Sequence, residues 1–170
     1  MDVETSIAMP CLERLKIDNC KLSCLPPGLA SSMRHGLREL YLYKLTNRTH
    51  VENIPSAVKL DVFDCTELKK ISGLSMLQKI RIVRGPKLEV LEGVPALDSL
   101  RLEDATMDTL PEYPRAVHPR YLELYCNKKI HESSLSPGSS EWKKISHIGK
   151  RDINCIEDSD TSSDGYSEED

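Results

Sequence analysis

Apolar residues along this chain recur in one short pattern, L-x-x-L-x-L-x-x-[NC], in which leucine-like positions alternate with polar ones. The pattern occurs six times, with substitutions, in the segments LERLKIDNC, LRELYLYKL, AVKLDVFDC, LQKIRIVRG, LDSLRLEDA and PRYLELYCN. The central apolar pairs begin at Leu15, Leu40, Leu60, Ile80, Leu100 and Leu122, in steps of 25, 20, 20, 20 and 22 residues. A period of this length indicates a stack of similar structural units.

Each central pair predicts a short strand, because alternate side chains of a strand point to opposite faces of its sheet. The two apolar residues of a pair, such as Leu40 and Leu42, then point into the core. One repeat alone cannot bury them, whereas stacked repeats with parallel strands can. The pattern and its period are typical of leucine-rich repeats. We therefore predict an α/β leucine-rich-repeat solenoid with a parallel β-sheet on its concave face.

The segments between the predicted strands return the chain along the convex side. Several contain prolines, at Pro26, Pro27, Pro55 and Pro111, which fix extended backbone where a helix would otherwise compete. We therefore expect mostly irregular or single-turn helical segments on the convex side.

The ninth position of each repeat turns the chain inward. It is occupied in turn by Cys20, Leu45, Cys65, Gly85, Ala105 and Asn127. The two cysteines fit buried structural thiols better than nucleophiles or metal ligands. Leu45, Gly85 and Ala105 depart from the usual Asn or Cys, which predicts irregular turns at those three places.

The repeats divide the chain into four parts. Residues 1–9 form an N-terminal extension, 10–131 about six repeats, 132–156 a C-terminal cap region, and 157–170 an acidic tail that we expect to be disordered. Trp142, Ile145 and Ile148 recur at three-residue intervals, which indicates one amphipathic cap segment. The residues before Pro10 are too few to cover the first repeat, so we expect another domain upstream, in the same polypeptide or in an ancestor of it.

The charge and the apolar content exclude several partners. The net charge is −4, and the last fourteen residues alone contribute −7, so the remainder carries +3. Such a weakly basic body does not predict a nucleic-acid-binding patch. No apolar run is long enough to span a bilayer, and the N-terminus lacks the features of a signal peptide. We therefore predict no membrane insertion, a cytoplasmic location and free thiols at all six cysteines.

The strand residues that alternate with the core form columns on the concave face. Five of the eight aromatic residues fall in these columns, and basic residues flank them. Tyr and Arg are enriched in interface centres. The predicted partner-binding residues are Lys16, Tyr41, Tyr43, Phe63, Arg81, Arg101, Tyr121 and Tyr125. The alternative is that the rings are structural, since aromatic residues favour strands in general.

Catalytic motifs are absent from the sequence. No phosphate-binding loop, dinucleotide-binding turn, zinc-protease helix or nucleophile elbow occurs. Cys126 with His118 or His131 does not make a catalytic triad by composition alone. The five histidines are widely separated in sequence, so we predict no metal site, no cofactor and no enzymatic activity.

The amino-acid sequence of the repeats also resembles that of a known family. The segments CLERLKIDNC KLSCLPPGL, LRELYL, AVKLDVFDCTELKKISGLSMLQKIRI, PKLEVLEGVPALDSLRLED and EWKKISHI, over about residues 10–150, are similar to the C-terminal repeats of plant nucleotide-binding leucine-rich-repeat disease resistance proteins, in particular cereal members of the coiled-coil type. The resemblance implies that these repeats recognise a pathogen effector or a guarded host protein, or restrain an adjacent nucleotide-binding module. The chain itself contains neither that module nor the coiled coil, so ATP binding and signalling are not implied.

Two other interpretations remain open. An F-box-type substrate adaptor would use the same curved surface, although no F-box segment precedes Leu12. The chain could also be a truncated receptor fragment without autonomous function. A cooperative unfolding transition would argue against the fragment interpretation.

Overall fold

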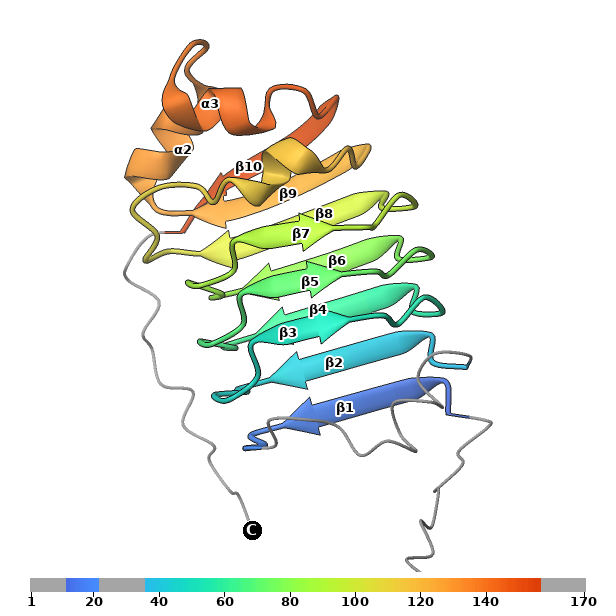
Figure 1. The fold of residues 1–170 in the computed structure, drawn as a ribbon. Helices are drawn as coiled ribbons and strands as arrows, with labels where there is room; N and C mark the ends of the chain where they lie inside the picture. Colours follow the sequence, from blue (N-terminus) through green and yellow to red (C-terminus); the bar gives the residue numbers. More distant parts are fainter. Residues whose placement is uncertain (1–11, 22–35, 157–170) are drawn as a thin grey trace, which may run out of the picture.

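The computed structural model describes residues 12–21 and 36–156 (Figure 1). The predicted N-terminal extension and the predicted acidic tail lie outside these ranges, as does the expected upstream covering of the first repeat. The described residues form a solenoid in which each repeat adds one strand to a parallel sheet. The predicted fold class is confirmed.

All six predicted strands are present, and we call the sheet that they build the concave sheet. They are β1 (Arg14–Asp18), β2 (Glu39–Tyr43), β4 (Lys59–Phe63), β6 (Lys79–Val83), β8 (Ser99–Asp104) and β9 (Tyr121–Cys126). The strands pair in parallel and in register, so Leu40 lies beside Leu60 and Leu60 beside Ile80. The register follows from the repeat, because a slip by one residue would turn every apolar side chain out of the core.

The core lies behind this sheet and consists of the predicted apolar pairs and of residues from the returns. Leu40, Leu60, Leu100 and Leu122 are at most 1% exposed. Burying a leucine fully contributes about 1.5–3 kcal/mol. Leu15, on the outermost strand β1, is only partly buried. Stacking of neighbouring repeats is therefore what encloses each row.

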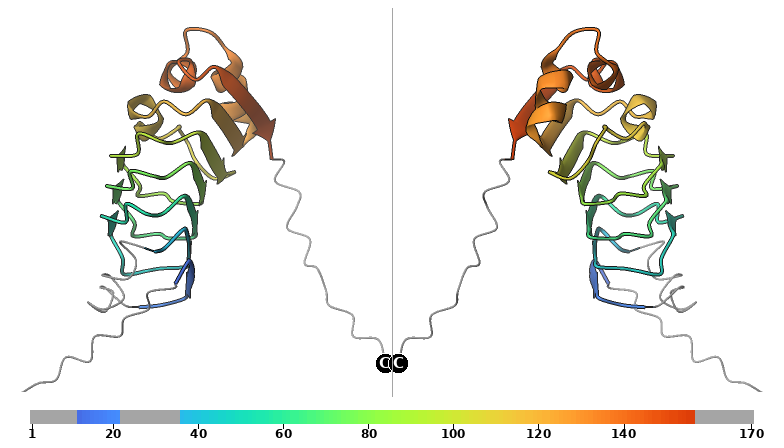
Figure 2. Two further views of the ribbon diagram at one scale, coloured as in Figure 1. Left: turned by 90° about the vertical axis from the view of Figure 1, so that its right-hand side faces the viewer. Right: turned by 90° about the vertical axis from the view of Figure 1, so that its left-hand side faces the viewer.

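The convex side contains more strand than expected. Three returns contain short strands, β3 (His50–Glu52), β5 (Lys70–Ser72) and β7 (Val90–Glu92), which form a second parallel sheet, the convex sheet. Their central residues, Val51, Ile71 and Leu91, are at most 1% exposed. The two sheets face each other across the core (Figure 2). The fifth return lacks such a strand and contains instead the single 3-10 turn η1 (Tyr113–Ala116).

The turns after the strands are more regular than expected. Lys44 and Arg84 adopt a left-handed backbone, as Asn19 and Asp64 do, and their N–H groups donate to the carbonyl of the neighbouring strand at 2.8 and 3.0 Å. The prediction of irregular turns at Leu45 and Gly85 is therefore wrong, because the preceding residue makes the turn and the ninth residue only fills the interior. The turn at Ala105 does differ, since Asp104 still belongs to strand β8.

The side chains at the ninth position of the repeats have two roles: some pack in the core, and others form hydrogen bonds in the turns. Cys65 is 1% exposed, and its Sγ lies 3.5 Å from the carbonyl oxygen of Leu42, so this thiol is structural as predicted. Cys20 is only partly buried. Asn127 bonds the carbonyls of Ala105 and Met107 through Nδ2, at 3.1 and 2.7 Å, and so connects two consecutive returns.

The C-terminal part contains α2 (Lys128–Leu135), α3 (Ser140–Ile145) and a further strand, β10 (Lys150–Cys155). Asn127 caps the N-terminus of helix α2, and its Oδ1 accepts from the Ile130 N–H at 3.0 Å. Ile145 and Ile148 are buried, as the three-residue interval indicated, whereas Trp142 is only partly buried. Strand β10, which the sequence analysis missed, pairs in parallel with β9 and makes the concave sheet seven-stranded (Figure 1).

Candidate functional site

The concave sheet brings all eight predicted partner-binding residues onto its outer face. Each of them lies on a strand and alternates with core residues, as the burial patterns of β2 and β9 show. The aromatic residues among them are half-buried, whereas the Lys16 side chain is 61% exposed. The structure places these residues on the predicted face but does not gather them at one point, because they are distributed from β1 to β9.

One compact group forms around the rings of Tyr43 and Phe63. Their centroids lie 5.7 Å apart with the planes inclined by 37°. The ammonium of Lys16 lies 4.8 Å from the Tyr43 centroid, and the guanidinium of Arg84 lies 5.0 Å from that of Phe63. A cation at this distance is attracted by the ring quadrupole. We call these four residues the Tyr43–Phe63 cluster.

The position of each cluster residue follows from the repeat. Tyr43 and Phe63 are register partners on β2 and β4, and paired side chains on one face of neighbouring strands lie in contact. Arg84 is the left-handed residue after β6, and its Nε lies 2.6 Å from a carboxylate oxygen of Asp64. That ion pair holds the guanidinium beside the ring of Phe63. The cluster therefore presents an apolar centre between two cations.

A polar network surrounds Tyr41 on the same face. The Tyr41 hydroxyl donates to Glu39 at 2.6 Å, and the Lys59 ammonium donates to that hydroxyl at 3.3 Å. The hydrogen bond to Glu39, followed by burial, raises the pKa of Tyr41. The same bond, together with Arg14, lowers the pKa of Glu39. Tyr41 is thus held in one orientation by charged neighbours on both sides.

Arg81 and Arg101 take part in a second network further along the sheet. Arg81 donates to Glu103 at 3.1 Å, and Arg101 donates to Glu123 at 3.1 Å. The guanidinium of Arg101 also lies 4.6 Å from the ring centroid of Tyr125. The charges of both arginines are therefore already paired within the sheet, and these ion pairs fix the orientation of their guanidinium groups.

Sequence reasoning missed the residues that orient the predicted ones. Lys59, Arg84 and the carboxylates of Glu39, Glu103 and Glu123 all contact a predicted residue. Of these contacts only that of Arg101 with Glu123 joins register partners, and the others are diagonal or lie within one strand, so the repeat spacing alone would not have found them. Lys150 lies 5.3 Å from the Tyr121 centroid, but it comes from β10, a strand that the sequence analysis did not predict.

Cys126, the candidate nucleophile in the sequence, is a core residue of β9, whereas His118 and His147 are exposed. Cys126 is 0% exposed, and burial, followed by the charge of Cys155, raises its pKa to about 11. Only the thiolate is a good nucleophile, so this environment disfavours the reactive form. His118 and His147, far apart in sequence, are brought together with ring centroids 5.3 Å apart.

No family model, curated protein or solved structure matches this chain. Across residues 12–21 and 36–156, no group of three or more His, Cys, Asp or Glu is arranged to hold a metal ion. Within the same ranges, no helix has the length and apolar character needed to cross a bilayer. The repeat fold and the chemistry of the concave face are therefore the features that point to a function.

Proposed function

We propose that this chain is a protein-binding leucine-rich-repeat module that uses the outer face of the concave sheet. The observation that carries the proposal is the Tyr43–Phe63 cluster, in which two half-buried rings lie between two cations. Rings and basic groups held in fixed orientations lose little conformational entropy on binding. Paired charges around such an apolar centre resemble the polar rim of a protein interface.

The partner class comes from the resemblance of the repeats to plant disease resistance proteins. In that family the repeats bind a pathogen effector or a guarded host protein, or they restrain an adjacent nucleotide-binding module. We propose the same roles for this chain, in the cytoplasm, with the eight predicted residues in contact with the partner. The role is one of recognition and involves no catalysis.

A site-specific cross-linking experiment tests the proposal. A photo-reactive phenylalanine analogue replaces Tyr43 in one sample and Glu92, an exposed residue of the convex sheet, in a matched control. After irradiation in plant cells, we expect a protein adduct from position 43 that is absent from position 92. Equal adducts from both positions would contradict the proposal.

Affinity measurements with the captured protein then decide whether the cluster contributes to binding. Tyr43→Ala with Phe63→Ala is expected to weaken binding at least tenfold, as removal of central interface residues commonly does. The control Glu92→Ala should bind like the wild type, since an exposed ion pair contributes little. Unchanged affinity in the double variant would show that the rings are structural.

Two alternatives give different results in the same experiments. An F-box-type adaptor would yield adducts with proteins that are ubiquitinated, and a ubiquitin ligase would accompany them. A receptor fragment without autonomous function would unfold without a cooperative transition. We expect a cooperative transition in urea, because all six predicted strands pair with their neighbours in register.

A further inference from the structure

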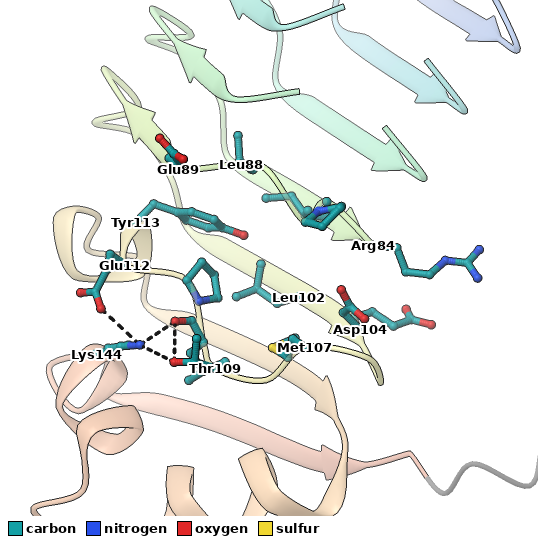
Figure 3. A pocket seen from close by; sticks show the side chains of 16 residues that line it. Arg84, Leu88, Glu89, Leu102, Asp104, Met107, Thr109, Glu112, Tyr113 and Lys144 are labelled. Atoms are coloured by element: carbon teal, nitrogen blue, oxygen red, sulfur yellow. Dashed lines mark hydrogen bonds and ion pairs between the residues drawn. The ribbon is translucent and has the colours of Figure 1, made fainter. Parts of the chain in front are cut away.

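A cavity opens at the edge of the solenoid where the 20-residue period is broken. The step from Leu100 to Leu122 is 22 residues long, and the return after β8 contains no convex strand. The return after β6, by contrast, continues into strand β7 of the convex sheet. The two returns therefore separate, and a cavity of about 490 Å³, open to solvent on one side, lies between them (Figure 3).

The interior of this cavity is largely apolar. Leu88, Met107 and Leu110 from the two returns line it, together with Leu102 from strand β8. Its volume falls within the range of about 300–1,000 Å³ that is common for ligand sites in proteins. A large apolar side chain would be well accommodated there.

Tyr113 gives the cavity a polar group without a partner. The residue is 5% exposed, and its ring points into the cavity (Figure 3). Its hydroxyl forms no hydrogen bond with any residue in the described part of the chain, and it is not among the polar atoms that are closed off from solvent, so a ligand in the cavity can reach it. Burial, followed by the charge of Asp104, raises the pKa of Tyr113, so the group is a neutral donor.

The charged residues that line the cavity include two carboxylates that form no ion pair. Arg84 points away from the cavity and pairs with Asp64, and Glu112 pairs with Arg115 and with Lys144. Glu89 and Asp104 line opposite ends of the cavity, and neither forms an ion pair within the described ranges, although Asp104 accepts two hydrogen bonds from Thr106. The charge that is left without an ion pair in the lining is therefore negative.

The wall opposite Leu88 is held by a buried ion pair from α3. The Lys144 ammonium donates to the carbonyl of Leu110 at 2.6 Å and to the Thr109 hydroxyl at 2.9 Å. The Glu141 carboxylate accepts from the Leu110 N–H at 2.6 Å and lies 3.5 Å from Lys144. These contacts fix the return that carries Tyr113, so the cavity is largely preformed.

We propose that this cavity is a second binding site, separate from the outer face of the concave sheet, for a peptide segment in which a large apolar residue is followed by a basic one. The apolar side chain fills the space between Leu88 and Leu102, and the Tyr113 hydroxyl donates to a carbonyl of the peptide. The basic side chain pairs with Glu89 or with Asp104, which lie at opposite ends of the cavity (Figure 3). A peptide suits the site because the open side leaves room for the chain to continue.

Three capped tetrapeptides test the chemistry of this site. Gly-Phe-Arg-Gly supplies both features, Gly-Phe-Glu-Gly reverses the charge, and Gly-Ala-Arg-Gly removes the ring. Titration followed by amide chemical shifts is expected to give shifts at Leu102, Met107 and Leu110 with the first peptide, and affinities at least tenfold weaker with the other two. Equal affinities for the three peptides, or shifts confined to the concave sheet, would overturn the proposal.

Variants of the chain test the assigned contacts. Tyr113→Phe should weaken binding of Gly-Phe-Arg-Gly about fivefold, the usual effect of removing one hydrogen bond. Glu89→Gln with Asp104→Asn should abolish the preference for Arg over Glu in the peptide. Glu132→Gln with Asp152→Asn, the same two changes at exposed positions of α2 and β10, serves as the matched control and should change neither value.

The two kinds of variant are independent. If Tyr113→Phe lowers the unfolding midpoint, the double variant Glu89→Gln with Asp104→Asn still tests the proposal, because neither carboxylate belongs to the hydrophobic core. Retention of the charge preference in that pair would overturn the assignment of the carboxylates. Wild-type affinity in a folded Tyr113→Phe variant would overturn the assignment of the hydroxyl.

Discussion

The ring of Tyr43 lies against the ring of Phe63 on the neighbouring strand, with centroids 5.7 Å apart and planes inclined by 37°. This tilted arrangement is one that aromatic pairs favour. Both rings are half-buried, so their contact stabilises the sheet as well as presenting a surface.

A double-mutant cycle measures that contact. Tyr43→Ala, Phe63→Ala and the double variant should give a coupling free energy of about 0.5–1.5 kcal/mol in urea unfolding. The loss in each single variant should be smaller than the roughly 2–5 kcal/mol expected for Leu60→Ala, whose side chain is fully buried in the core. A coupling energy of zero would show that the rings stabilise the sheet independently of each other.

Gly93 should tolerate no side chain. It has a φ of +62°, and a Cβ added there would lie 2.9 Å from the backbone nitrogen of Gly73 in the preceding repeat. Gly138 has a φ of +88° with nothing within 4 Å of such a Cβ, so it isolates the effect of the backbone angle. We expect Gly138→Ala to lower the unfolding free energy by about 1 kcal/mol, and Gly93→Ala to lower it by at least about 1 kcal/mol more, since backbone must shift. Equal losses would argue against the close stacking of the two returns.

Glu141 should make the stability of the chain sensitive to acid. Burial opposes ionisation of this carboxyl, but the Leu110 N–H and the Thr109 hydroxyl outweigh it and lower its pKa below 4.5. A group whose pKa is lowered by folding contributes stability above its unfolded pKa and loses it as the pH falls through the folded pKa. The stabilisation from Glu141 should thus be complete near neutral pH and decline below about pH 4.5.

Urea unfolding of Glu141→Gln at several pH values checks this expectation. At pH 7 the variant should lose about 3 kcal/mol, the low end for breaking a buried ion pair, because Glu112 still pairs with Lys144. The difference from the wild type should shrink steadily as the pH falls below 4.5. A difference that stays constant down to pH 3 would contradict the assigned charge state.

Cys126 and Cys155 should differ strongly in reactivity although they are register partners on β9 and β10. Cys126 is buried with a pKa raised from 9.0 to about 11, so its thiolate fraction near neutral pH is about a hundredfold below that of an ordinary thiol. Cys155 is exposed. Alkylation by iodoacetamide, followed by peptide mass spectrometry, should modify Cys155 at least a hundredfold faster. Similar rates would show that β10 detaches readily from the sheet.

The strands of the concave sheet could be predicted because each carries two core residues at alternate positions, as Leu60 and Val62 do. The convex strands could not, since each contains a single buried residue, such as Ile71, within three positions. Strand β10 was missed for a similar reason: in KRDINC only Ile153 packs against the core. A strand with so weak an alternation forms because its neighbour offers unpaired backbone groups.

The positions of the candidate residues followed from the same alternation, whereas their neighbours did not. Tyr43 and Phe63 could be placed on one face because their spacing equals the repeat. The stacking of Arg84 on Phe63 depends on a left-handed turn and on an ion pair with Asp64, which the pattern does not contain. The cavity beside Tyr113 depends on how two returns diverge, and the repeat step of 22 residues was its only sign in the sequence.

The convex strands also determine the shape of the surface offered to a partner. A solenoid bends when its convex layer takes up more length per repeat than its concave layer. Over β3, β5 and β7 both layers consist of strands with the same spacing of about 4.8 Å. The two layers are therefore equally long there, and the solenoid has little reason to bend. Beyond β8 the outer layer contains η1 and then helices, which are about 10 Å wide. The concave sheet is therefore almost flat from β2 to β6, and strands β9 and β10 are inclined to that flat part (Figure 2). A rigid partner would contact the flat part with one face and the inclined strands with one side.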